Sequence, residues 1–347
     1  MKKLFALTLA LIVMFTMTAC GNQSQTGGAD SSAETPKEVK TIKIAHGASE
    51  SYHMHRAWVK FKEELEKTGN FKVEIYPSSQ FGNDAEMVES VKTGDLTMAT
   101  PPSSFLTDEA PEMALIELPY IFPSRQAAID TLAGEWGQSQ LKKLEGSGMI
   151  GLGYLENGLR HLTNSRRPVR TPEDIKGLKL RTMQVPAHVY LWNSLGATAE
   201  GAPFAELYTN LSTKVFDGQE NPIAHIYSQK FYEVQNYMTL TGHVYTAYAP
   251  VMSLDFWKSL TPEEQKQITD TFEVARQYQL SLIDQEESKQ LEEIKNNKTY
   301  PTEVTELTPT EMQKFVDAAK ATLDHYRTEL GAETYDKFIE AIKNATK

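Results

Sequence analysis

The sequence of 347 residues contains one cysteine, Cys20, and fewer basic than acidic residues. One cysteine cannot form an internal disulfide, a cysteine-based zinc site or an iron–sulfur cluster. The 35 lysines and arginines are outnumbered by 46 acids, and a formal net charge of −11 argues against a nucleic-acid-binding protein. Beyond residue 17 there is no apolar run long enough to span a bilayer. What remains is an ordinary globular composition, with a length that suggests about two domains.

The amino-terminal segment predicts export. Two lysines precede an apolar run over residues 4–17, which has the length of a signal-peptide core. The sequence MTACG at residues 17–21 resembles the lipobox of bacterial lipoproteins, which implies removal of residues 1–19 and a lipid anchor on Cys20. The alternative is an ordinary secretory signal that contains a cysteine by chance. Residues 20–40 lack apolar periodicity and predict a flexible tether.

The next segment alternates strand and helix patterns. Strands are predicted over residues 41–45, 71–75 and 96–100, with helices over 56–67 and 83–94 between them. This order predicts a parallel sheet covered by helices, whose ligands bind beyond the carboxyl ends of the strands. Those ends are residues 46–48, 77–79 and 101–103.

The second half of the chain predicts a second lobe and one long helix. Residues 149–155 form a strand pattern, and a second α/β lobe is expected to begin near Gly158. Thr261 opens a helix that meets no glycine or further proline until about Asn297, which is about 55 Å of helix. The predicted boundaries are 41–157 plus about 246–285 for lobe I, and 158–245 plus about 286–347 for lobe II.

A series of short motifs resembles the solute-binding proteins of tripartite ATP-independent periplasmic (TRAP) transporters. Each motif is weak alone, but they occur in the family's order over nearly everything from Thr41 onward. The resemblance implies an α/β, two-lobed periplasmic-binding-protein-like (Venus flytrap) fold with the long helix spanning both lobes. The motifs are Tyr76-Pro77-Ser78-Ser79-Gln80-Phe81-Gly82, Asn157-Gly158-x-Arg160, read as a turn, Gly177-Leu178-Lys179-Leu180-Arg181, Pro203-Phe204-x-Glu206-Leu207-Tyr208 and Asp217-Gly218-Gln219-Glu220-Asn221-Pro222.

The resemblance also implies a carboxylate site. Arg181 ends a strand pattern, and a guanidinium can bind a carboxylate through two parallel hydrogen bonds. The resemblance implies that Arg181 binds the ligand carboxylate, with Arg160 and Asn221 beside it. It also implies that Phe204 forms an apolar wall of the site. For any single arginine the alternative is a salt bridge, and for Phe204 it is core packing.

Four further positions are candidates for ligand contact. Gln184 stands where sialate-binding members of the family have asparagine, and Pro102 stands where they have an acid, which argues against sialate. Glu50 and His53 follow the first strand and could contact the far end of the ligand, and Ser103 lies at the end of the third strand.

Catalytic, cofactor and metal sites are not expected. Residues 146–151 match GxGxxG, but a helical pattern precedes the glycines and a strand follows them, the reverse of a dinucleotide site. His53 and His55 lack carboxylate or cysteine ligands at suitable spacing. We therefore expect no enzyme and no cofactor, but a receptor for an organic acid that delivers it to a TRAP membrane permease from the extracytoplasmic face of the membrane or the periplasm. The alternatives are a ligand sensor for a receptor kinase and a surface hydrolase or lyase.

Overall fold

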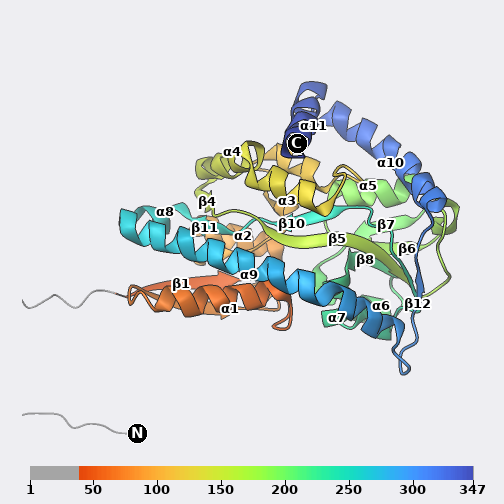
Figure 1. Cartoon of the computed structure of the whole chain (residues 1–347), viewed down its shortest axis with the longest axis horizontal. Coiled ribbons are helices and arrows are strands. Elements are labelled where there is room, and N and C mark those ends of the chain that lie inside the picture. Colours follow the sequence, from red (N-terminus) through yellow and green to blue (C-terminus); the bar gives the residue numbers. More distant parts are fainter. Residues whose placement is uncertain (1–38, 347) are drawn as a thin grey trace, which may run out of the picture. The chain divides into compact units, whose positions relative to one another are not determined.

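The computed structural model describes residues 39–346, so the predictions for the signal peptide, Cys20 and most of the tether lie outside the described residues (Figure 1). Eleven α-helices and two sheets make up this part of the chain. No helix within it is both long and apolar enough to cross a bilayer. The helices are α1 His53–Glu66, α2 Asp84–Thr93, α3 Arg125–Ala133, α4 Glu135–Lys143, α5 Pro186–Ser194, α6 Leu207–Ser212, α7 Ile223–Ser228, α8 Leu254–Lys258, α9 Pro262–Lys295, α10 Pro309–Glu329 and α11 Ala332–Ala345.

The first sheet has the order β2-β1-β3-β11-β4. Strand β1 pairs in parallel with both β2 and β3, which confirms the predicted parallel arrangement. Strand β11, which the sequence pattern did not assign to this sheet, pairs antiparallel with β3 and β4, so the complete sheet is mixed. The strands are β1 Lys40–Ala45, β2 Phe71–Tyr76, β3 Met98–Ala99, β4 Met149–Gly151 and β11 Val251–Ser253.

The second sheet has the order β12-β9-β5-β8-β6-β7, with β10 paired to β5. Its longest strand, β5, passes through Gly158 without a turn, so the turn predicted at residues 157–160 is wrong. Gly158 adopts a φ of +117° where the pairing of β5 with β10 shifts register, so the glycine serves a bulge. The strands are β5 Leu155–Asn164, β6 Lys179–Thr182, β7 Thr198–Gly201, β8 Gly218–Pro222, β9 Tyr237–Thr239, β10 Tyr245–Tyr248 and β12 Glu303–Thr305.

The strand predicted over residues 149–155 is two strands, β4 and β5. Gly153 separates them with a φ of +151°. A Cβ on Gly153 would lie 2.5 Å from the ring of Phe272, so the glycine lets α9 pack closely at this break.

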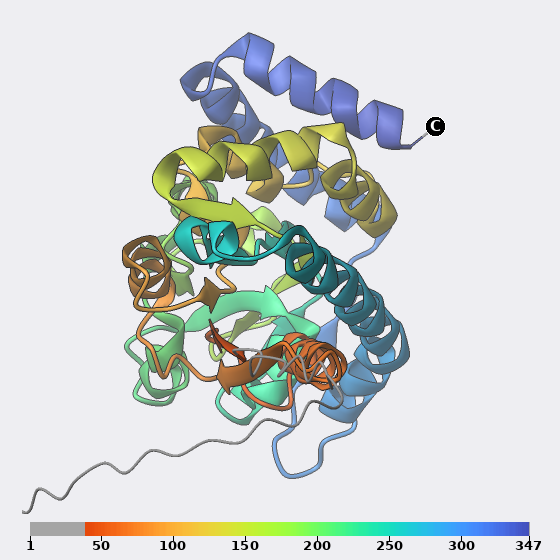
Figure 2. The ribbon, with the colours of Figure 1, turned by 90° about the vertical axis from the view of Figure 1, so that its left-hand side faces the viewer.

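The predicted long helix is confirmed as α9. Thr261 caps it in a reciprocal capping box with Glu264, and its 34 residues extend about 51 Å. Phe272 packs into the core beside the first sheet, and Ile294 packs into the core beside the second. Helix α9 therefore runs along both halves of the described fold, next to α1 at one end and α7 at the other (Figures 1 and 2). The exact lobe boundaries stay a prediction.

Helices α10 and α11 close the chain. Thr308 and Glu311 form a capping box at the start of α10, of the same kind as the one that opens α9. In Figure 2, α11 lies over α3 and α4, and Phe338 of α11 packs against Trp136 and Phe122. The carboxyl-terminal segment is thus part of the packed structure.

Candidate ligand-binding cavity

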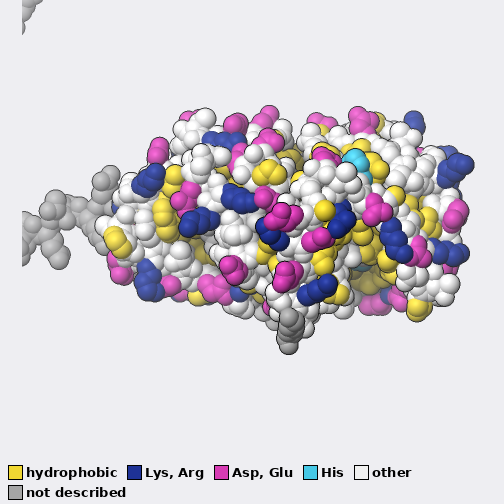
Figure 3. Space-filling view, turned by 90° about the horizontal axis from the view of Figure 1, so that it is seen from above, with side chains coloured by type: hydrophobic (Ala, Val, Ile, Leu, Met, Phe, Trp, Pro, Cys, Tyr) yellow, Lys and Arg dark blue, Asp and Glu magenta, His cyan; other side chains and the backbone are white. Residues whose placement is uncertain are grey.

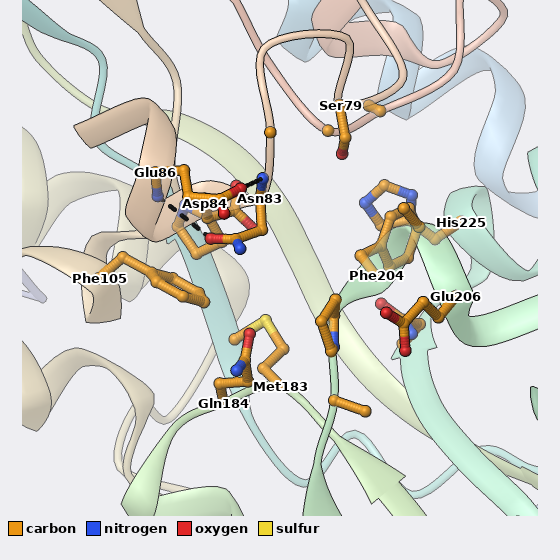
Figure 4. A pocket seen from close by; sticks show the side chains of 18 of the residues that line it. Ser79, Asn83, Asp84, Glu86, Phe105, Met183, Gln184, Phe204, Glu206 and His225 are labelled. Atoms are coloured by element: carbon orange, nitrogen blue, oxygen red, sulfur yellow. Dashed lines mark hydrogen bonds between the residues drawn. The ribbon is translucent and has the colours of Figure 1, made fainter. Parts of the chain in front are cut away.

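A cavity of about 350 Å³ lies between loops that leave the two sheets (Figure 4). This volume suits a small organic ligand. All three predicted strand ends contribute residues to its wall: Gly47 and Ala48 after β1, Ser79 after β2 and Pro102 after β3. The side chains from the second sheet and its connections are Arg181, Met183, Gln184, Phe204, Glu206, Asn221 and His225, with Asn157 from β5 and Tyr248 from β10.

Arg181 is the cationic side chain of the cavity wall. It lies in β6, and its Nε and Nη2 donate to the carbonyl of Ala202. Its Nη1 is buried and has no hydrogen-bond partner among the described residues. Burial and the nearby Arg160 lower the pKa of Arg181. A buried donor left without a partner is costly, so this nitrogen marks a place where an anion would be stabilised.

Phe204 and Asn221 also line the cavity. The guanidinium carbon of Arg181 lies 5.9 Å from the centre of the Phe204 ring, and that ring packs 4.8 Å from the ring of His225. Asn221 donates to Gln219 and accepts from Arg160 Nη2 at 3.3 Å, which fixes its amide. Gln184 lies on the wall near Met183 and makes no hydrogen bond within residues 39–346.

Arg160 is fully buried and does not line the cavity. Its guanidinium makes an ion pair with Glu220, with Nη2 2.8 Å from Oε1. The two residues lie on the paired strands β5 and β8, whose antiparallel register brings them together. The salt bridge that was the alternative for any arginine is therefore what the structure contains at Arg160.

Glu220 is the centre of a buried polar cluster. His243 Nε2 lies 2.9 Å from one carboxylate oxygen, and His188 Nδ1 lies 3.6 Å from the other. Burial alone would lower the pKa of His188, but Glu220 and Glu117 raise it above its ordinary value. His188 Nε2 lies 3.1 Å from Glu117, so the imidazole bridges two carboxylates. Together with Arg160, this cluster fixes the strand that carries Asn221.

Three predicted site residues lie elsewhere. Glu50 is exposed, and Ser103 is buried with its hydroxyl 3.5 Å from Glu117. His53 is buried, with Nδ1 3.1 Å from Gln279 of α9. None of the three lines the cavity. Within residues 39–346, no group of three or more histidine, cysteine, aspartate or glutamate side chains is arranged so that it could hold a metal ion. The GxGxxG match at residues 146–151 begins after α4 and ends within β4, so a helix precedes the glycines and no helix begins at them.

The cavity also contains residues that the sequence did not single out. His225 stacks on Tyr52 at 3.9 Å, and its Nε2 lies 2.8 Å from the Tyr248 hydroxyl. Asp84, the first residue of α2, was visible only as part of a capping pattern. Burial raises the pKa of Asp84 to about 6, and Arg181 partly offsets that rise. No spacing rule points to these side chains because they reach the cavity from separate elements.

Known proteins resemble this chain over most of its length. The sequence matches the model of bacterial extracellular solute-binding proteins, family 7, over residues 44–329. The 2,3-diketo-L-gulonate-binding periplasmic protein YiaO of Escherichia coli is 32% identical over 306 residues, 88% of each chain. The C4-dicarboxylate-binding protein DctB of Bacillus subtilis is 32% identical over 353 residues, covering 99% of this chain and 100% of the relative. The sugar acid binding protein DctPAm from Advenella mimigardefordensis, solved in complex with galactonate, has a TM-score of 0.84 at 31% identity, over 89% of this chain and 100% of that one.

Proposed function

We propose that this chain, which belongs to the DctP family of bacterial extracellular solute-binding proteins (family 7), uses Arg181 to bind the carboxylate of an organic acid and delivers that acid to a TRAP membrane permease. Members of the family are extracellular or periplasmic binding proteins. The same proposal makes Cys20 a lipid anchor on the extracytoplasmic face of the membrane. It assigns the chain no catalytic role.

The observation that carries the proposal is the unpartnered Nη1 of Arg181 at the cavity wall. Two of the three guanidinium nitrogens are held by the carbonyl of Ala202, which fixes the plane of the group. A carboxylate about 4 Å from this charge gains about 4 kcal/mol at an effective dielectric constant of 20, before desolvation. The Phe204 ring lies next to the guanidinium, with its centre 5.9 Å from the guanidinium carbon, which is within range of a cation–π contact.

The position of the cavity supports a mechanism of closure around the ligand. Loops after β1, β2 and β3 form one wall, and residues after β6 and β8 form another. A ligand that contacts both walls would favour the closed conformation over an open one, because only the closed conformation provides all the contacts. The closed, loaded receptor would then be the form that the permease recognises.

Replacement of Arg181 by alanine tests the proposal. We expect R181A to lose at least about 100-fold in affinity for the tightest-binding organic acid, measured by isothermal titration calorimetry, because a charge-assisted hydrogen-bond pair is removed. The matched control is R166A, since Arg166 is largely exposed and makes only a 3.7 Å contact with Asp217. Unchanged affinity in R181A would refute the assignment of the carboxylate site.

A ligand sensor for a receptor kinase would use the same cavity, so deletion of the permease subunits separates the two roles. If the protein serves transport, deletion of the permease subunits should stop uptake of the acid. If the protein is a sensor, the same deletion should leave uptake intact. A hydrolase or lyase would convert the bound acid, and we expect the acid to be recovered unchanged after long incubation with the protein.

A further inference from the structure

Asp84 is a carboxylate at the cavity wall without a partner of its own. Its side chain makes no hydrogen bond or ion pair with any other residue in the range 39–346. Glu86, two residues later, differs from Asp84, because its carboxylate accepts a hydrogen bond from the backbone N–H of Asn83 at 2.7 Å in the capping box. Figure 4 shows Asp84 at the start of α2, across the cavity from Phe204, Glu206 and His225.

The helix N-terminus does not explain this placement by itself. An acid in the first turn of a helix is favoured by the helix dipole, but this preference is satisfied equally by a carboxylate in solvent. Asp84 instead lies against the cavity, where Oδ1 would be 3.9 Å from a Cβ added at Gly47. Asp84 is half-buried against the cavity, and no residue in the range 39–346 donates a hydrogen bond to its carboxylate. The missing donor is therefore expected to come from the ligand.

Besides Asp84, the wall carries a second carboxylate without a hydrogen-bond partner among the described residues, Glu206, and three neutral amides with free capacity. Asn157 accepts from the Tyr52 hydroxyl at 2.7 Å through Oδ1, which leaves its amide nitrogen for a ligand. Asn83 accepts from Glu86 N through Oδ1 and likewise keeps its amide nitrogen. Gln184 has both amide atoms free within the part of the chain that the structure describes. Amide donors and acceptors next to a carboxylate match hydroxyl groups, since each hydroxyl both donates and accepts.

We propose that the ligand is a hydroxylated monocarboxylic acid, and that Asp84 selects it against dicarboxylic acids by accepting a hydrogen bond from a ligand hydroxyl. This inference rests on the proposed function, in which Arg181 holds the single carboxylate. A second carboxylate at the far end of the ligand could only accept hydrogen bonds, so it would face Asp84 with like charge and no shared proton. An ammonium group would leave the amide donors of Asn83 and Asn157 without acceptors.

Two matched sets of acids, of four and six carbons, test the inference by calorimetry on the full-length protein. Each set contains a hydroxylated monocarboxylate, a plain monocarboxylate and a plain dicarboxylate: erythronate, butyrate and succinate, then galactonate, hexanoate and adipate. We expect the wild type to bind at least one hydroxylated acid about tenfold or more tightly than both of its matched partners. We expect D84N to bring the affinities for the hydroxylated acid and the dicarboxylate within about threefold of each other. The control D108N, which removes an exposed carboxylate outside the cavity, should leave the ratio unchanged.

The results separate this inference from the proposed function. If neither hydroxylated acid binds, if a dicarboxylate binds as tightly, or if D84N leaves the ratio as it is in the wild type, the selection by Asp84 is overturned. In those cases R181A still tests the carboxylate site. If R181A fails to bind every acid that the wild type binds, the proposed receptor function stands although the selection by Asp84 does not. Circular dichroism and thermal unfolding of D84N establish that the variant is folded, and a conservative D84S variant provides the same test if D84N is not.

Discussion

At the scale of single residues, the cavity places a cation and a carboxylate in one small space without joining them. Arg181 and Asp84 influence each other electrostatically, yet they do not form an ion pair. Each therefore keeps hydrogen-bonding capacity that the folded chain does not use, and such capacity costs stability. The pair is better explained by ligand binding than by folding.

Neutralising Asp84 should stabilise the ligand-free protein at neutral pH. Burial raises the pKa of Asp84 from 3.8 to about 6, so the native state disfavours the ionised form. The stability associated with the protonated carboxyl is present below about pH 4 and is lost as the pH rises through 6. We expect D84N to exceed the wild type by about 1 to 2 kcal/mol in free energy of unfolding at pH 7.5, because one pKa unit corresponds to about 1.4 kcal/mol and the half-buried carboxylate keeps part of its hydration.

Urea unfolding of both proteins at pH 7.5, 6 and 4.5 measures this difference. The gap should shrink steadily as the pH falls, since protonated aspartate and asparagine are both neutral. A wild type that is more stable than D84N at pH 7.5 would contradict the account, because Asp84 would then have a partner in the native state. D108N again controls for the loss of one negative charge.

The sequence could indicate Arg181, Asn221 and Phe204 as cavity residues because each lies in a motif of a recognisable family, and Gln184 because it stands where some members of that family have asparagine. It could not indicate that Arg160 turns away from the cavity, because that depends on Glu220 lying on the adjacent strand. Asp84 was hidden for a different reason. Its position after Asn83 already had a sufficient local explanation as the first turn of a helix.

At the scale of elements, local signals predicted most helices and strands. Capping boxes at Asn83 and Thr261 fixed two helix starts to within a residue. What could not be predicted depends on pairing between distant segments. Strand β11 enters the first sheet antiparallel from more than one hundred residues away, and Gly158 lies inside a strand rather than in a turn.

The bulge at Gly158 gives an element-scale prediction. Alanine at this position would make an ordinary van der Waals contact, with Pro222 Cβ 3.6 Å from its Cβ, but would be strained at a φ of +117°. We expect G158A to lose about 1 to 3 kcal/mol of free energy of unfolding. It should also weaken ligand binding, because β5 carries both Asn157 and Arg160.

The matched control is G146A. Gly146 has nothing within 4 Å of an added Cβ and does not have a positive φ, so alanine should change stability by less than about 0.5 kcal/mol. Chemical denaturation of both variants measures the difference. Equal stability of G158A and the wild type would mean that the bulge does not require a glycine.

At the scale of the whole molecule, the negative net charge of the protein is compatible with binding a negatively charged ligand. The net charge is −11, but on the face in Figure 3 acidic and basic side chains are interspersed. At physiological ionic strength, exposed charges are screened beyond about 8 Å, whereas a buried guanidinium at contact distance is not. The local charge of Arg181 therefore decides ligand binding, and the total does not.

The architecture at this scale is the predicted one. Two α/β halves are joined by β5, β10 and the long helix α9, and the neighbours of known structure have the same two-lobed fold. A composition of ordinary globular type and a strand–helix alternation sufficed for this class. The cavity between the halves required the three-dimensional arrangement, since its wall draws on eight separate segments of the chain.

The most direct test of the central claim is a crystal structure of the protein with its tightest-binding organic acid. We predict a ligand carboxylate oxygen within about 3.2 Å of Arg181 Nη1, with the rest of the ligand directed toward Asp84. A ligand that lies in this cavity with its carboxylate away from Arg181, or that occupies a different site, would contradict the account.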